Sequence, residues 1–140
     1  MSNVIIKGYH VKHNLTLNKD IDIKNLLLKA KKVADYAVKN KIPMIAYTYN
    51  EPAVFLEYAH DTAKLAKKKG IKNIYVTNGY ETKEALELMK PYIDAMNIDL
   101  KSFNDDFYKK TCGARLEPVL ETIKLAKKMN FWIEITTLII

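Results

Sequence analysis

The sequence of 140 residues contains one cysteine, Cys112, and one arginine, Arg115. A single cysteine excludes an internal disulfide framework, and it excludes a metal site that this chain would build from several thiolates. His10 and His13 have no thiol neighbours in the sequence, so we interpret both as exposed polar residues. We therefore expect no metal site made by this chain.

Long apolar runs are also missing. No stretch approaches the roughly 20 apolar residues that a helix needs to cross a bilayer. The N-terminus has no basic segment followed by an apolar run and a small-residue cleavage site. We therefore expect no membrane association and no export, and predict a cytoplasmic location.

The formal net charge of +7 comes almost entirely from lysine. Nucleic-acid sites commonly add arginine and stacking aromatic side chains to such a charge. Here the lysines fall on the outer sides of predicted helices: Lys64, Lys67, Lys68, Lys124, Lys127 and Lys128. We interpret them as a solvated surface and expect no nucleic-acid partner.

Hydrophobic patterns divide the chain near residue 22. Residues 1–21 show only a short β-like segment, so we predict an irregular N-terminal lead-in. After it, apolar residues at helical spacing predict a helix of about four turns with Asp22 as its N-cap. Its predicted inner face consists of Leu26, Leu27, Ala30, Val33, Ala34 and Ala37.

Strand and helix patterns then alternate to the end of the sequence. Short apolar segments predict strands at residues 42–48, 71–77, 95–101 and 131–140. The segments between them predict helices over 52–69, after Thr82, over 104–110 and over 118–129. This order indicates right-handed βαβ crossovers and an α/β fold with a parallel sheet and flanking helices.

The strand at 95–101 alternates between apolar and polar residues. Met96, Ile98 and Leu100 point to one side, and Asn97, Asp99 and Lys101 point to the other. In a parallel barrel the apolar set faces the outer helices, and the polar set lies near the carboxyl end of the strand, where barrel active sites are found. Asp99 and Lys101 therefore either form a structural ion pair or meet a ligand.

The ends of the other strands are polar as well. The first strand is followed by Thr48, Asn50 and Glu51, and the second ends at Thr77 and Asn78. The fourth contains Glu134, Thr136 and Thr137. Four successive strands thus turn hydrogen-bonding side chains toward one rim, which predicts a site for a polar, zwitterionic or hydroxylated ligand.

Five segments together carry a family resemblance. They are TYNEP at residues 48–52, TNGY at 77–80, NIDLKSF at 97–103, FYKKTCGARLEPVLETIKLAKK at 107–128 and IEITTLII at 133–140. In this order and spacing they resemble radical S-adenosylmethionine (SAM) proteins related to pyruvate formate-lyase activating enzyme, in particular the AmmeMemoRadiSam subgroup. The resemblance implies that residues 22–140 form a partial parallel (β/α) barrel of about four strands with flanking helices.

The resemblance also implies residues that would bind SAM. Residues 49–52 occupy the place of the GGEP-like motif that holds the SAM amino group, which makes Tyr49, Asn50 and Glu51 candidates. Thr77 and Asn78 lie at the next SAM-side contacts, and Asp99 and Lys101 match a DxK pair beside the methionyl carboxylate. We include Glu134 and Thr136, from the fourth strand, as further candidates.

One feature of the family is absent from this sequence. Family members hold a 4Fe–4S cluster through a CxxxCxxC motif, and the cluster requires thiolate ligands. Cys112 lies instead in the CGAR segment after the third strand, and we interpret it as a structural cysteine at a helix end. SAM is therefore the implied cofactor, whereas this chain has no ligand set for the cluster.

Three hypotheses about function follow. The first is that the chain is the SAM-binding half of a radical SAM enzyme. The parent proteins generate a 5′-deoxyadenosyl radical, and this chain alone would be inactive because it lacks the cluster cysteines. The second is a non-catalytic binding or scaffold subunit that pairs with another chain. The third is a Schiff-base lyase that uses Lys101.

Assembly is expected from the exposed edges of such a sheet. The segment 131–140 is β-branched and contains no lysine, so it is suited to pairing with another strand. We expect a homo-oligomer or a complementing chain that supplies the CxxxCxxC segment. The alternative is that the first twenty residues fold back over one edge of the sheet.

Overall fold

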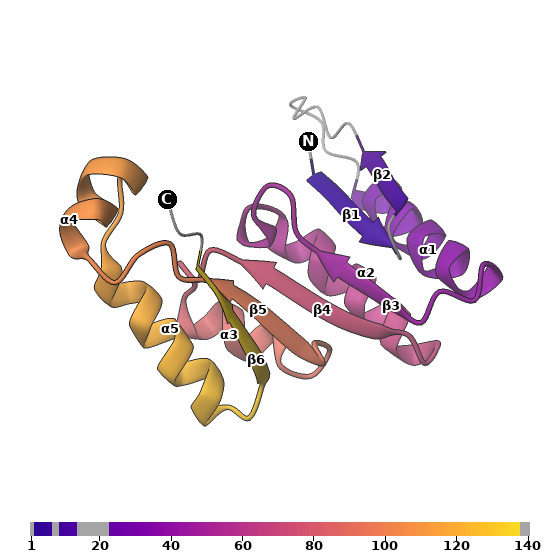
Figure 1. Cartoon of the computed structure of the whole chain (residues 1–140). Coiled ribbons are helices and arrows are strands. Elements are labelled where there is room, and N and C mark those ends of the chain that lie inside the picture. Colours follow the sequence, from indigo (N-terminus) through magenta and orange to yellow (C-terminus); the bar gives the residue numbers. More distant parts are fainter. Residues whose placement is uncertain (1, 7–8, 14–22, 138–140) are drawn as a thin grey trace.

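The fold is that of a computed structural model, which describes the backbone of residues 2–6, 9–13 and 23–137 and the side chains of residues 27–137. Within these residues, six strands form one sheet in the order β2-β1-β3-β4-β5-β6 (Figure 1). The strands are β1 (Ser2–Ile6), β2 (Tyr9–His13), β3 (Met44–Tyr47), β4 (Lys72–Thr77), β5 (Ala95–Asp99) and β6 (Trp132–Thr136).

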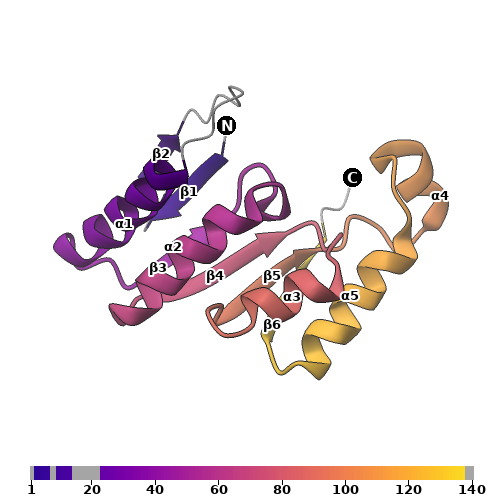
Figure 2. The same ribbon diagram turned by 180° about the vertical axis from the view of Figure 1, so that it is seen from behind.

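The helices connect the strands, and the longer ones lie on one face of the sheet (Figure 2). They are α1 (Ile23–Lys39), the 3₁₀ turn η1 (Pro52–Phe55), α2 (Leu56–Lys68), α3 (Lys83–Met89), α4 (Asp105–Phe107), the π-helical turn η2 (Tyr108–Cys112) and α5 (Leu116–Lys128). Strands β3 to β6 run parallel, so the predicted α/β class and the open, partial-barrel sheet of four parallel strands are confirmed.

The N-terminal segment differs from the prediction of an irregular lead-in. Strand β1 pairs antiparallel with β3, with Val4 opposite Tyr47 and Ile5 opposite Ala46, and β2 pairs antiparallel with β1. Strands β1 and β2 have five residues each, and β1 pairs with β3, which lies about forty residues later in the chain. Local periodicity cannot reveal such a pairing. Asp22, the predicted N-cap of α1, lies outside the described residues.

The core lies between the sheet and the helices. Ile45 and Tyr47 on β3, Tyr75 on β4, and Met96 and Ile98 on β5 are buried at alternate positions. Small helical residues pack against them: Ala30, Ala34, Ala37, Ala59, Ala63, Ala66 and Ala126 are completely buried. Leu27 was predicted on the same inner face but is 45% exposed, because it lies beyond the buried stretch of α1 at residues 30–37.

A polar side chain ties the core layers together. Asn73 on β4 is completely buried and accepts a hydrogen bond of 2.9 Å from the Tyr47 hydroxyl. Its amide group donates to the carbonyl oxygens of Ala63 and Tyr92, at 3.0 Å each. Since buried polar groups are costly unless paired, Asn73 fixes the register of β3, β4 and α2.

The opposite face of the sheet carries no helix in the described part of the chain (Figures 1 and 2). Met44 on β3 is 43% exposed there, and Trp132 on β6 is 65% exposed. The carboxyl ends of β3, β4 and β5 meet at one rim of the sheet, and this rim positions the candidate site.

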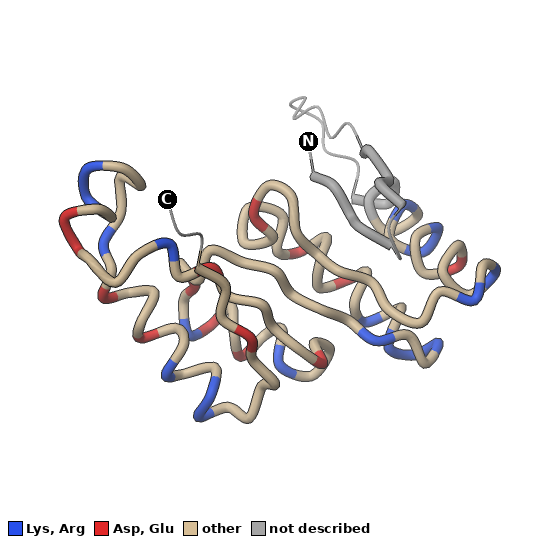
Figure 3. The backbone as a smooth tube through the Cα atoms, viewed as in Figure 1, with Lys and Arg blue, Asp and Glu red and all other residues tan. Residues whose placement is uncertain are grey.

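Lysines gather at the opposite end of the molecule. Helices α2 and α5 each end in two lysines, Lys67 and Lys68 in α2 and Lys127 and Lys128 in α5 (Figure 3). All four side chains are exposed, as predicted. Lysine at a helix C-terminus is favoured by the helix dipole, which gives this basic surface a structural explanation.

Candidate functional site

The rim formed by β3, β4 and β5 contains a cleft of about 480 Å³. It is lined by Thr48, Tyr49, Asn50, Glu51, Val76, Thr77, Asn78, Asp99 and Lys101. The structure therefore brings together every candidate residue that was predicted from the first three parallel strands. A cleft of this size can accommodate part of a cofactor, with polar groups on three sides.

Glu51 joins the ends of two strands. It precedes η1 as the N-cap, and its Oε1 accepts the Ala53 N–H at 3.3 Å. The same oxygen accepts the Thr77 hydroxyl at 2.7 Å, and Oε2 accepts the Asn78 N–H at 2.7 Å. The Glu51 carboxylate thus connects the loop after β3 to the end of β4 and stays at the edge of the cleft.

The turn after β4 depends on backbone geometry. Gly79 has φ of 77° and donates its N–H to Thr77 Oγ1 at 3.1 Å. The Asn78 side chain accepts the Tyr80 N–H at 2.8 Å, which closes the turn on the cleft side. Residues Thr77 and Asn78 are therefore placed by local hydrogen bonds before any ligand is present.

Glu81 adds a second carboxyl group beside Thr77. Its Oε1 lies 3.0 Å from Thr77 Oγ1. Burial raises the pKa of Glu81 above its ordinary value and the charge of Glu51 raises it further, while the contacts with Thr77 and Tyr75 oppose these effects. Sequence analysis missed Glu81, since nothing in its local pattern distinguishes it from a surface glutamate before a helix.

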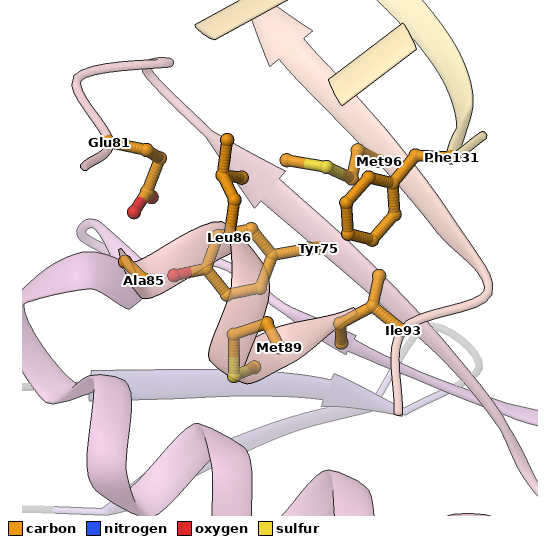
Figure 4. Close-up of a pocket in the computed structure, with 8 residues that line it drawn as sticks. All are labelled: Tyr75, Glu81, Ala85, Leu86, Met89, Ile93, Met96 and Phe131. Atoms are coloured by element: carbon orange, nitrogen blue, oxygen red, sulfur yellow. The ribbon is translucent and has the colours of Figure 1, made fainter. Parts of the chain in front are cut away.

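Tyr75 lies under Glu81 in the apolar layer between β4 and α3. Its ring packs among Leu86, Met89 and Met96, and its hydroxyl is buried without a hydrogen bond of normal geometry (Figure 4). Burial raises the pKa of Tyr75, and the nearby Glu81 and Glu51 carboxyl groups raise it further. Tyr75 therefore remains neutral.

Asp99 and Lys101 form an ion pair at the end of β5. Lys101 Nζ lies 2.5 Å from Asp99 Oδ2, and the two side chains are 44% and 30% exposed. The Lys101 backbone N–H donates to the Tyr108 hydroxyl at 3.0 Å, which anchors this segment to η2. Met96 and Ile98 are buried on the other side of β5, as the alternation predicted.

The two candidates from β6 do not line the cleft. Thr136 exchanges hydrogen bonds with the Asn97 side chain, at 3.0 and 3.2 Å. Glu134 is exposed and lies opposite Asn97 in the sheet register. The reason is the strand order, because β5 separates β6 from β3 and β4.

The described residues offer no ligand set for an iron–sulfur cluster. None of them form a group of three or more His, Cys, Asp or Glu side chains that could hold a metal ion. Cys112 lies at the end of η2, as predicted, and is exposed. One thiolate does not fit the ligand requirement of such a cluster.

Residues 21–140 match the sequence profile of the radical SAM superfamily. This chain belongs to the radical SAM superfamily. The match spans all four parallel strands and the whole cleft, and it confirms the family that the sequence motifs resemble. SAM and a 4Fe–4S cluster are the cofactors of this superfamily. No helix in the described part of this radical SAM chain is long and apolar enough to cross a membrane.

Two curated proteins are similar to this radical SAM chain. An uncharacterised protein of Methanocaldococcus jannaschii is 50% identical over 108 residues, which cover 77% of this chain and 32% of the relative. A GTP 3′,8-cyclase of Lactiplantibacillus plantarum is 30% identical over 93 residues, covering 64% of this chain and 28% of the relative. The chain thus spans about a third of the length of the curated relatives it matches.

A solved structure supports the same fold. The chain is similar to a domain of pyruvate-formate lyase-activating enzyme from Bacteroides vulgatus, with a TM-score of 0.60 and 23% sequence identity. The similarity covers 66% of this chain and 57% of that domain. The partial barrel of this radical SAM protein therefore shares the fold of that domain.

Proposed function

We propose that this chain is the SAM-binding half of a radical SAM enzyme and that its cleft holds the amino-acid end of SAM. The observation that carries the proposal is the placement of Glu51 and Lys101 in one cleft. SAM carries an ammonium and a carboxylate on the same carbon atom. A site with one acidic and one basic side chain at separate strand ends complements both groups.

The hydrogen bonds of Glu51 leave room for the ammonium group. A carboxylate oxygen can accept about two hydrogen bonds. Oε1 already accepts two, from Ala53 and Thr77, whereas Oε2 accepts one, from Asn78. One acceptor position on Oε2 therefore remains for a ligand N–H, and ligand binding does not have to break the contacts that hold the loop.

Lys101 would supply the positive charge for the SAM carboxylate. It is held beside Asp99, so a ligand carboxylate would share the ammonium group or displace Asp99 from it. Competition of this kind favours weak binding by this chain alone. Tyr49, Asn50 and Asn78 line the same cleft and supply further polar surface.

The cluster of the superfamily does not fit this chain, and we derive no radical step from its residues. We propose that the chain binds SAM without cleaving it and that a complementing chain with the CxxxCxxC segment is needed for radical chemistry. The scaffold hypothesis remains compatible with the fold. A Schiff-base lyase is not favoured, because Lys101 is paired with Asp99 rather than isolated in an apolar pocket.

The proposal is tested by isothermal titration calorimetry with SAM and Lys101→Met. Loss of a charge-assisted contact costs about 1.5–3 kcal/mol, so we expect SAM affinity to fall about tenfold or more. Lys64→Met is the matched control, since Lys64 is an exposed lysine on the outer side of α2. The control should bind like the wild-type chain. Equal affinity of Lys101→Met and wild type would remove Lys101 from the site.

A further inference from the structure

Thr77 lies between two carboxyl groups and has a single hydroxyl proton. Its Oγ1 is 2.7 Å from Glu51 Oε1 and 3.0 Å from Glu81 Oε1. The same oxygen already accepts the Gly79 N–H at 3.1 Å. The single hydroxyl proton cannot be donated to both carboxyl groups. If both carboxyl groups were ionised, one of the two contacts would therefore bring two oxygen atoms together with no proton between them.

A proton on one carboxyl group resolves the conflict, and the surroundings decide which group carries it. Both oxygens of Glu51 already accept a backbone N–H group, from Ala53 on Oε1 and from Asn78 on Oε2. Glu81 makes no ion pair among the described residues and no hydrogen bond with a backbone N–H there. Glu81 also borders the apolar layer that contains Tyr75 and Leu86.

We propose that Glu81 is a positioning residue for Glu51. The Glu81 carboxyl group carries a proton and donates it to Thr77 Oγ1. The single Thr77 proton is then directed to Glu51 Oε1. This keeps Oε2 turned toward Asn78 and the cleft. The assignment deepens the proposed function, because it rests on Glu51 as the group that accepts the SAM ammonium.

The groups around Glu81 act on its pKa in opposite directions: burial and the Glu51 charge raise it, and the contacts with Thr77 and Tyr75 lower it. Tyr75 and Thr77 face it from β4, and Glu51 faces it from the loop after β3. From α5, the Thr122 hydroxyl donates to the Glu81 backbone carbonyl at 3.3 Å. The nearest lysines of α3 and α5 are engaged at the surface: Lys83 pairs with Glu87, and Lys124 with Glu117. The raised pKa of Glu81 is consistent with the proton count.

The proposal has a definite dependence on pH. Because the folded-state pKa of Glu81 lies above its ordinary value of 4.5, the folded state binds the proton more tightly than the unfolded state. The bound proton of Glu81 therefore adds to the free energy of unfolding. This contribution is complete below the unfolded-state pKa and is lost as pH rises through the folded-state pKa. Glu81→Gln keeps an N–H donor for Thr77 and cannot ionise, so it should not show this loss.

The direct test is a carbon-13 NMR titration of the full chain with labelled glutamate carboxyl groups. We expect Glu81 to titrate at higher pH than Glu87, an exposed residue of the following helix α3. We expect the Glu51 signal to show an inflection at the same pH as Glu81. Thr77→Val should remove this inflection, since it removes the hydroxyl that couples the two groups. Titration of Glu81 together with Glu87, or a Glu51 signal unaffected by Glu81, would overturn the proposal.

A second measurement separates this inference from the proposed function. SAM affinity of the wild-type chain should fall about fivefold or more as pH rises through the Glu81 titration, as expected for the loss of one hydrogen bond in the site. Glu81→Gln should lack this fall, and Glu87→Gln should behave as wild type. If SAM does not bind at any pH while the NMR coupling is observed, the proposed function is wrong and the proton assignment holds. Binding with the same pH profile in wild type and Glu81→Gln overturns the positioning role.

Discussion

Gly79 shows how a single residue sets the geometry of the cleft. At this position a Cβ atom would lie 2.8 Å from Ile98 Cγ2 and 3.0 Å from Val119 Cγ1. The positive φ also disfavours any residue with a side chain. Glycine is therefore required at position 79 for two reasons, the positive φ and the lack of space for a Cβ atom. The Gly79 N–H also holds Thr77 in place.

We predict that Gly79→Ala lowers the free energy of unfolding by about 2 kcal/mol or more, because backbone strain and a steric clash add together. Gly113→Ala is the matched control. Gly113 also has positive φ, of 62°, but nothing lies within 4 Å of its potential Cβ. It should cost only about 1 kcal/mol, from the backbone alone. Urea unfolding of both variants measures the difference, and equal losses would show that the contact with Ile98 and Val119 has no energetic effect.

At the scale of elements, much of the fold could be predicted from the sequence. The alternation of β5 and the N-cap of α3 were both visible, and Thr82 indeed accepts the Ala85 N–H at 3.2 Å. These features depend on residues close together in the chain. Gly113, which ends η2 in the left-handed conformation, is likewise a local feature.

Other elements could not be predicted because they depend on distant pairing. Strand β1 pairs with β3, although the whole of helix α1 lies between them in the sequence. The exclusion of Glu134 and Thr136 from the cleft follows from the strand order, which the local pattern of β6 does not contain. Glu81 contacts Thr77 Oγ1 at 3.0 Å although the two residues are only four apart, and no sequence pattern marks this contact. The candidate residues from β3, β4 and β5 were predicted together because parallel strands end at one rim.

At the scale of the molecule, the sheet is covered unequally. Strand β1 lies along β3, so the chain itself covers that edge, as one of the alternatives from the sequence required. Strand β6 is the last strand at the other edge of the described sheet, with Trp132 and Ile135 65% and 49% exposed. The face opposite the helices is uncovered as well in the described part (Figure 1).

We predict that the chain forms a dimer or a larger assembly through the β6 edge, since exposed strand edges with apolar side chains favour pairing. Sedimentation equilibrium at tens of micromolar protein should show a mass above that of the single chain. Trp132→Lys should shift the equilibrium toward the monomer, because lysine on an edge strand opposes pairing. A wild-type monomer with slowly exchanging amides in β6 would contradict this prediction.

The central claim is that the rim of β3, β4 and β5 binds the amino-acid end of SAM. The most direct test is a map of backbone amide chemical-shift changes when SAM is added to the nitrogen-15-labelled chain up to millimolar concentration. The account predicts changes concentrated at residues 48–51, 77–78 and 99–101, with Glu134 and the N-terminal half of β6 unaffected. Changes centred on β6 or on the helices, or no change at millimolar SAM, would contradict it.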